Sequence, residues 1–310
     1  MDFTLSDEAR ELAALTRELA ASGRPLWPAL AEAGVLAAAL PKRAGGEGYG
    51  LIEQCAILVE LGRAAATVPY LPSIVAAASA LARFGTDDQV ASWAAPAGQG
   101  RLVLTAAPTP GAPVPAADQA ALVLVPDGPD VLLVRTDDPA VTVQPQRVDG
   151  GPGAGLVHFA GAETPRLAGA AAWLAAHATV GACAAQLGVI ERALEMTAGY
   201  ARSRIQFGRP IGSFQAVSQR LADAYIDVEA LRLALWQAAW SPGASEVATA
   251  GFWAAEAGHR VLHAAVHVHG GVGLDVDYPL HRYFLAAKHH EFLLGGATGQ
   301  LLALADTFRS

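Results

Sequence analysis

The order of hydrophobic and polar residues divides the chain into three parts. Up to about residue 102, apolar residues recur with the three-to-four-residue spacing of amphipathic helices. Short β-rich runs follow, and the helical spacing then returns and continues to the end. We predict an amino-terminal helical domain, a small β domain and a carboxy-terminal helical domain, over residues 1–102, 103–164 and 165–310.

The first part predicts helices with clear starting signals. Ser6 precedes two acidic residues, which suits a helix amino terminus, and further helices are predicted over 27–39 and 51–63. Between these two helices, residues 41–50 form a glycine-rich turn. The turn lacks both a preceding strand and a Gly-Lys-Ser/Thr sequence, which argues against a phosphate-binding loop.

The middle part predicts a small antiparallel β unit. Proline, glycine and aspartate separate its runs of valine and leucine, which begin at Leu102, Ala121, Val131 and Val141. Asp-Gly-Pro-Asp at 127–130 predicts a hairpin turn between two of these runs. Beyond the β unit, four long helical segments predict a four-helix bundle, over 166–203, 213–240, 244–268 and 280–308.

Composition narrows the class of protein. Hydrophobic residues make up 53% of the chain, but no uninterrupted apolar run reaches the ~20 residues of a membrane span. The most apolar stretch, 167–189, contains His177 and Gln186, and we interpret it as a buried helix. The formal net charge of −8 argues against binding to nucleic acid. The acidic start, with Asp2, is unlike a signal peptide, so we expect a cytoplasmic protein with no membrane attachment.

Cysteine and histidine do not indicate a metal site. Cys55 and Cys183 each lie in apolar sequence and are expected to be small core residues. Several histidines gather near the carboxy terminus, but none forms a convincing ligand set with a carboxylate, so no metal is expected: His263, His267, His269, His281, His289 and His290.

Residues 200–217, YARSRIQFGRPIGSFQAV, carry the strongest functional signal. The guanidinium of Arg204 suits a diphosphate, since it is planar and always charged. Phe207 offers a flat apolar face, Gly208 leaves room for close approach, and Gln215 can form hydrogen bonds with a ligand. Taken singly, Arg204 is better explained by a surface carboxylate partner and Phe207 by core packing. The complete string favours a ligand site.

A second candidate element lies at 266–282, VHVHGGVGLDVDYPLHR. The adjacent Gly270 and Gly271 allow a ligand to approach the backbone closely. His267 can donate a hydrogen bond there, whereas His269 is expected to pack within the turn.

Together these two elements resemble the flavin-binding elements of the acyl-CoA dehydrogenase family. The resemblance implies a mostly α fold with a small central β unit, FAD as cofactor, and contacts that reach across an interface to the FAD of a neighbouring subunit. Family members remove an α-proton from an acyl-CoA thioester with a glutamate while a hydride leaves the β-carbon for the flavin. The resemblance covers the whole chain in order, but specific motifs occur only in its last 140 residues or so.

Both family positions for the catalytic glutamate lack an acid in this chain. Alignment with the family places Gly295 or Leu294 at one position and Ala178 at the other. Glu291, one helical turn before Gly295, and His177, beside Ala178, are the remaining candidates for the base. The β unit also lacks the family's Thr-Glu-Pro and tryptophan strings, which hold the flavin ring.

Three hypotheses follow from the resemblance. The first is a non-catalytic subunit of an α2β2 acyl-CoA dehydrogenase, resembling those of actinobacterial steroid side-chain degradation. It would bind FAD together with a longer catalytic subunit, act on a bulky acyl-CoA and pass electrons to an electron-transferring flavoprotein. The second is a self-sufficient homo-oligomeric dehydrogenase that uses Glu291 as base. The third is a flavin-free helical scaffold of the same fold.

Overall fold

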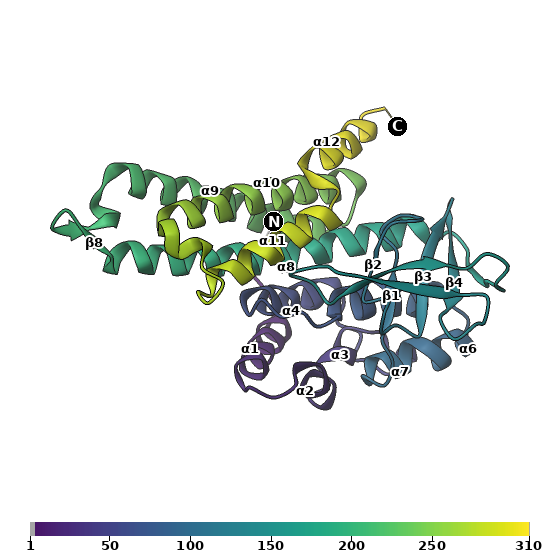
Figure 1. Ribbon diagram of the computed structural model, residues 1–310. Helices are drawn as coiled ribbons and strands as arrows, with labels where there is room; N and C mark the ends of the chain where they lie inside the picture. The colour runs from purple at the N-terminus through teal and green to yellow at the C-terminus, as the bar shows by residue number, and fades with distance from the viewer. Residues whose placement is uncertain (1–3, 310) are drawn as a thin grey trace.

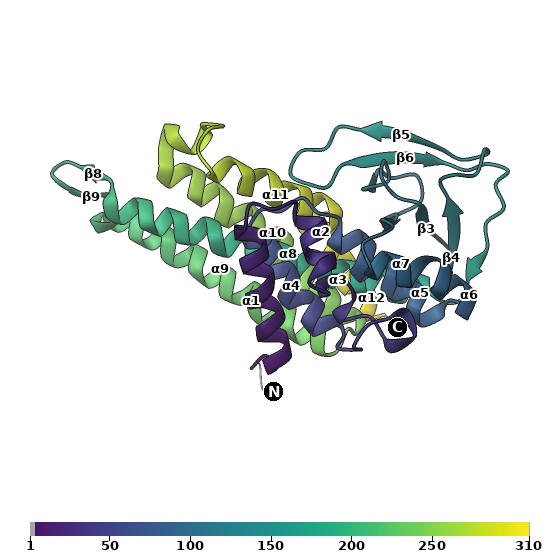
Figure 2. The same cartoon turned by 90° about the horizontal axis from the view of Figure 1, so that it is seen from below.

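The computed structural model describes residues 4–309, so Asp2 of the acidic start lies outside the described residues (Figure 1). Amino-terminal helices form one layer, two small sheets lie at one end, and long carboxy-terminal helices form a bundle across the amino-terminal layer (Figures 1 and 2). The described fold is mostly helical with a small β unit, as the sequence predicts.

The amino-terminal layer begins where the capping signal predicts. The Ser6 hydroxyl accepts a hydrogen bond of 3.1 Å from the Ala9 amide, and Leu51–Arg63 is helical as expected. The prediction of one helix over 27–39 is wrong, because Gly34 adopts a left-handed φ of 75° and breaks it in two. The elements of this layer are α1 (Asp7–Ala21), α2 (Leu26–Glu32), α3 (Val35–Ala38), η1 (Lys42–Ala44), α4 (Leu51–Arg63), η2 (Leu71–Ala78), α5 (Ser79–Phe84), α6 (Asp87–Gln89), η3 (Val90–Ala94) and α7 (Ala95–Gly98).

The β unit consists of two sheets, with strand orders β1-β3-β4-β7 and β2-β6-β5. The predicted hairpin is confirmed, since Asp127 pairs with Asp130 and Gly128 has a φ of 59°. The strands are β1 (Leu104–Ala106), β2 (Val114–Pro115), β3 (Leu122–Asp127), β4 (Asp130–Arg135), β5 (Thr142–Gln146), β6 (Ala154–His158) and β7 (Arg166–Leu167).

The expectation of a purely antiparallel unit needs one correction. Strands β1 and β3 are parallel, with Leu104 opposite Leu122. The chain between them contributes β2 to the other sheet before it returns to start β3 in the same direction as β1. Parallel neighbours need such a long connection, which alternation of residues does not reveal.

The carboxy-terminal part forms the predicted bundle from α8 (Ala171–Ser203), α9 (Gln215–Trp240), α10 (Ala244–His269) and α11 (Leu280–Leu293). The helix predicted over 280–308 is two helices, because Gly295 and Gly296 both have a φ of 71°. From the second of these glycines, α12 (Gly296–Thr307) packs against α10, and none of its residues is buried. The short elements between the long helices are β8 (Ile205–Gln206), β9 (Arg209–Pro210), η4 (Ile211–Ser213) and η5 (Gly270–Leu274).

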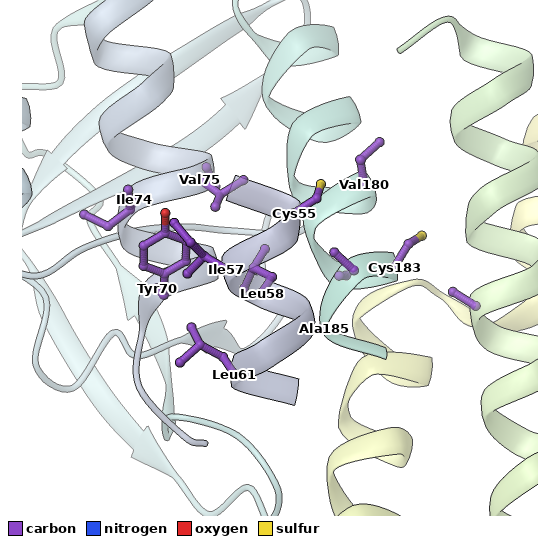
Figure 3. Close-up of a cluster of buried hydrophobic side chains, with 14 of the residues drawn as sticks. Cys55, Ile57, Leu58, Leu61, Tyr70, Ile74, Val75, Val180, Cys183 and Ala185 are labelled. Atoms are coloured by element: carbon purple, nitrogen blue, oxygen red, sulfur yellow. The ribbon is translucent and has the colours of Figure 1, made fainter. Parts of the chain in front are cut away.

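Helix α8 joins the bundle to the amino-terminal layer. It packs against α4 so closely that a methyl group on Gly188 would lie 1.9 Å from the Val59 carbonyl oxygen. Cys55 and Cys183 are free thiols with 0% exposure in this apolar core, as predicted (Figure 3). Helix α8 alone among the described helices is long and apolar enough to cross a membrane, but 72% of its most apolar window is buried inside the fold. The interpretation as a buried core helix is therefore confirmed.

Candidate functional site

The Arg-x-x-Phe-Gly string forms a hairpin that projects from one end of the bundle (Figures 1 and 2). Helix α8 ends at Ser203, and the amide of the next residue, Arg204, donates to the Tyr200 carbonyl over 2.8 Å. Gln206 then pairs with Arg209, which leaves Phe207 and Gly208 as a two-residue turn with φ angles of 53° and 76°. Positive φ at both positions is what a type I′ hairpin requires, and it is unfavourable for phenylalanine.

The side chains of this hairpin point outward. Phe207 is 92% exposed, so the alternative that it is a core residue is wrong. Among residues 4–309, its ring contacts one other aromatic ring, that of Phe214, edge to face with the centroids 6.1 Å apart. Arg204 is also exposed, and among residues 4–309 no carboxylate lies within ion-pair distance of its guanidinium. The alternative of a surface ion pair for Arg204 therefore finds no partner in the described chain. Gln215, exposed as well, is the first residue of α9.

The glycine pair lies where α10 ends and η5 begins. Gly270 has a φ of 64°, which favours glycine, and a methyl group on Gly270 or Gly271 would meet no atom within 4 Å. This backbone is thus open to an approaching group. His267 is exposed beside it, whereas His269 is 3% exposed and packs within the turn, as predicted.

The two predicted elements lie at the same end of the bundle. The ring of Tyr200, one turn before Arg204, stacks on His269 with 4.4 Å between ring centroids. Large apolar side chains around these elements are exposed to solvent. We call them the apolar rim: Ile205 (54% exposed), Phe207 (92%), Val272 (40%), Leu274 (75%) and Val276 (71%).

A separate cavity of about 160 Å³ lies where the three parts of the chain meet. Residues of α4, η2, the β unit, α8 and α11 line it, and no carboxylate is among them. Its polar lining residues are Thr179, His289 and His290. Ala178, which the family resemblance aligns with one of the two positions for the catalytic base, is on the cavity wall. A methyl group therefore stands where the resemblance calls for an acid.

Neither substitute for the base lines this cavity. The Glu291 carboxylate receives a hydrogen bond of 2.7 Å from Lys288 Nζ and lies 3.5 Å from His259 Nδ1. His177 stacks on Trp173 at 3.5 Å, and its Nδ1 donates to the Trp173 carbonyl over 3.0 Å. Burial lowers the pKa of His177 to about 4. Both side chains thus already have partners in the fold.

A loop that the sequence did not single out closes one side of the cavity. Residues 150–152 of the β unit lie against α11, where a methyl group on Gly150 would be 2.4 Å from the Leu285 carbonyl group and one on Gly151 would be 2.5 Å from the His289 ring. In the sequence, the consecutive glycines at 150 and 151 were the one signal that could have marked this loop, but only the fold shows that they lie against α11. Within residues 4–309, no group of three or more histidine, cysteine or acidic side chains is arranged to hold a metal.

The profile of the acyl-CoA dehydrogenase amino-terminal domain matches residues 4–101, and that of the carboxy-terminal domain matches residues 169–307. Acyl-CoA dehydrogenase FadE27 of Mycobacterium tuberculosis is 46% identical over 97% of both chains. Among solved structures, a chain of the ChsE4-ChsE5 complex from Mycobacterium tuberculosis is 44% identical, with a TM-score of 0.95 over 100% of this chain and 99% of that one. A chain of the Tcur3481-Tcur3483 steroid ACAD variant is 37% identical, with a TM-score of 0.92 over 99% of each chain.

The chain therefore belongs to the acyl-CoA dehydrogenase family of oxidoreductases. Dehydrogenases of this family are flavoproteins, and a glutaryl-CoA dehydrogenase of Mycobacterium smegmatis that shares the fold was solved with FADH2. That structure is 16% identical to this chain with a TM-score of 0.83, so it bears on the fold alone.

Proposed function

We propose that this chain is the non-catalytic subunit of a heteromeric, FAD-dependent acyl-CoA dehydrogenase. One observation carries the proposal: the candidate cofactor elements project from the bundle end opposite the β unit, while the chain's own cavity has no carboxylate in its wall (Figure 1). A base is needed to remove the α-proton. The chain is therefore equipped to hold a cofactor for another subunit and not equipped to carry out the proton transfer.

The exposed hairpin and glycine turn fit part of an FAD molecule. Arg204 has no carboxylate partner in the described chain and would hold the diphosphate, with a hydrogen bond from Gln215 beside it. Phe207 and Gly208 would cover an aromatic ring of the cofactor, and the open backbone at Gly270 and Gly271, with His267, would approach its polar part. Bound FAD supplies the acceptor for the hydride that leaves the substrate.

The apolar rim supports a protein partner at this end. Exposed large apolar groups that gather around a ligand site mark an interface. Two similar structures, the ChsE4-ChsE5 complex and the Tcur3481-Tcur3483 steroid ACAD, are assemblies of two components. We therefore assign this chain to an α2β2 assembly with a longer catalytic subunit. The assembly acts in the cytoplasm on a bulky, steroid-type acyl-CoA, and an electron-transferring flavoprotein is its acceptor.

The test is FAD binding by the assembled protein. The tagged chain is isolated from its native host with its partner, and the dissociation constant of FAD is measured for the wild type, Arg204→Ala and Arg202→Ala. Arg202 is an exposed arginine two residues away and is the matched control. Loss of a charge-assisted hydrogen bond to phosphate, on the order of 1.5–3 kcal/mol, predicts at least tenfold weaker binding for Arg204→Ala only. Equal FAD affinity in all three proteins would refute the role in cofactor binding.

The isolated chain separates the proposal from its two alternatives. The proposed subunit is colourless when purified alone and gains FAD and activity with the partner. Stoichiometric FAD that is bleached by acyl-CoA in the isolated chain would instead support a self-sufficient enzyme with Glu291 as base. Failure to hold FAD with any partner would support a flavin-free scaffold.

A further inference from the structure

His269 is a buried polar group, 3% exposed, at the end of the bundle that carries the candidate FAD elements. It is the last residue of α10, directly before the left-handed Gly270, and its side chain does not face the open surface of the glycine turn. Because its side chain is buried away from this surface, His269 can affect a binding site only by holding neighbouring residues in position.

The contacts of its imidazole are specific. Nδ1 donates to the Ala265 carbonyl over 2.9 Å, because a carbonyl can only accept. Nε2 therefore carries the lone pair and accepts a hydrogen bond of 3.1 Å from the Tyr278 hydroxyl. Both nitrogens are thus satisfied in one neutral tautomer, and burial lowers the pKa of His269, which favours the same neutral form.

The ring also contacts the element that leads into the hairpin. It stacks on Tyr200 with an interplanar angle of 22°, and the Tyr200 carbonyl accepts the hydrogen bond from the Arg204 amide. On its other side, the Cβ of His269 would be 3.1 Å from a methyl group on Gly273, so the glycine turn is packed tightly against it. The imidazole therefore contacts the end of α8 and the segment just before α11, and the Cβ of the same residue lies against the glycine turn.

We propose that His269 is a positioning residue for cofactor binding, which fixes the Arg204 hairpin and the Gly270-Gly271 turn relative to each other through Tyr200 and Tyr278. This inference rests on the proposed function, since it assumes that both elements bind one FAD. If the Arg204 hairpin and the Gly270-Gly271 turn are already fixed relative to each other, they lose less conformational entropy when FAD binds to both. Their fixed arrangement therefore increases the affinity for FAD.

The test uses the partner complex and FAD. His269→Phe keeps an aromatic ring against Tyr200 but removes both hydrogen bonds, and Tyr278→Phe removes only the hydroxyl. We expect the dissociation constant of FAD to rise about tenfold in His269→Phe and by a smaller factor in Tyr278→Phe. The double variant should bind no more weakly than His269→Phe, because both changes break the same bond.

His177→Phe is the matched control. His177 is also a buried α-helical histidine that donates from Nδ1 to the carbonyl four residues earlier and stacks on an aromatic ring, but it lies far from the hairpin end. The proposal requires that His269→Phe weakens FAD binding while its melting temperature falls no further than that of His177→Phe. Tyr278→Phe keeps the proposal testable should His269→Phe fail to fold.

The outcomes distinguish the two proposals. If Arg204→Ala weakens FAD binding but His269→Phe and Tyr278→Phe do not, the positioning role is wrong and the proposed function stands. If Arg204→Ala has no effect, the proposed function itself falls, and the positioning role falls with it.

Discussion

Phe207 is the residue whose environment departs furthest from what its chemistry favours. A phenylalanine is rarely so exposed, and its positive φ adds backbone strain. Neither feature is explained by contacts within residues 4–309, where Phe214 is the one aromatic residue whose ring contacts that of Phe207. A partner or cofactor that covers the ring accounts for both.

Replacement of Phe207 by asparagine should separate stability from binding. Asparagine tolerates positive φ, so we expect Phe207→Asn to raise the free energy of unfolding of the isolated chain by about 1 kcal/mol. The same variant should retain less FAD in the complex because the aromatic face is lost. Urea unfolding and FAD titration measure the two effects. A less stable chain, or unchanged FAD binding, would contradict this account of the hairpin.

The Glu291 side chain offers a direct test of the self-sufficient alternative. Its carboxylate is held by Lys288 and is not part of the cavity wall. We therefore expect Glu291→Gln to leave dehydrogenase turnover of the complex within about twofold of the wild type, whereas loss of a general base lowers rates by 10²-fold or more. Turnover with a steroid acyl-CoA is the measurement, and a hundredfold loss would identify Glu291 as the base.

Among the elements, the β5–β6 connection and α11 are fitted closely to each other. Gly151 leaves no space for a methyl group against the His289 ring, so Gly151→Ala has to displace the loop or the imidazole. We expect a loss of about 1–3 kcal/mol in the free energy of unfolding.

Gly199→Ala is the control for this prediction. Gly199 lies within α8, and a methyl group there would meet nothing within 4 Å. This change should stabilise the chain by up to about 1 kcal/mol through helix propensity. Urea denaturation of both variants measures these changes in the free energy of unfolding. Equal stability of Gly151→Ala and the wild type would show that the loop does not rest on α11.

The sequence predicts elements well where a local signal determines them. Helix α4 has the predicted bounds, and the hairpin at 127–130 follows from its turn residues. Helix breaks at Gly34 and Gly295 were missed, because a glycine in an apolar pattern does not reveal its φ. Strand β6 was missed as well, since its pairing with β5 depends on partners distant in the sequence.

The sequence predicts only part of the candidate site, because only part of it has a local sequence signal. The hairpin and the glycine pair have local motifs, and the structure brings them to one end of the bundle. Tyr200 and Tyr278 were not singled out as site residues, because their contacts with His269 join three separate segments. The position of Ala178 on the cavity wall likewise depends on how α8 packs against the β unit and α11.

At the scale of the whole molecule, buried histidines make the fold sensitive to acid. Burial lowers the pKa of His177 and His289 to about 4 and that of His290 to about 3, below the value near 6.5 of an unfolded chain. At a pH between the folded-state and unfolded-state pKa values, the unfolded state binds more protons than the folded state. Stability is therefore complete above about pH 6.5 and falls as the pH is lowered toward 4.

Urea unfolding at pH 7, 6 and 5 measures this dependence. The shift of His177 alone corresponds to about 3 kcal/mol between pH 6.5 and 4, so His177→Phe should flatten the pH profile. His158→Gln, at an exposed position of β6, should leave the profile unchanged. A wild-type stability that is constant from pH 7 to 5 would contradict the burial of these histidines.

The apolar rim also has a consequence for synthesis of the protein in the cell. A chain made in excess of its partner presents Ile205, Phe207 and Leu274 to water and to other copies of itself. Surplus copies are then prone to aggregate or to be degraded. In the proposed assembly, production of the two chains in equal numbers removes this hazard, so the exposed end of the bundle ties the abundance of this protein to that of its proposed partner.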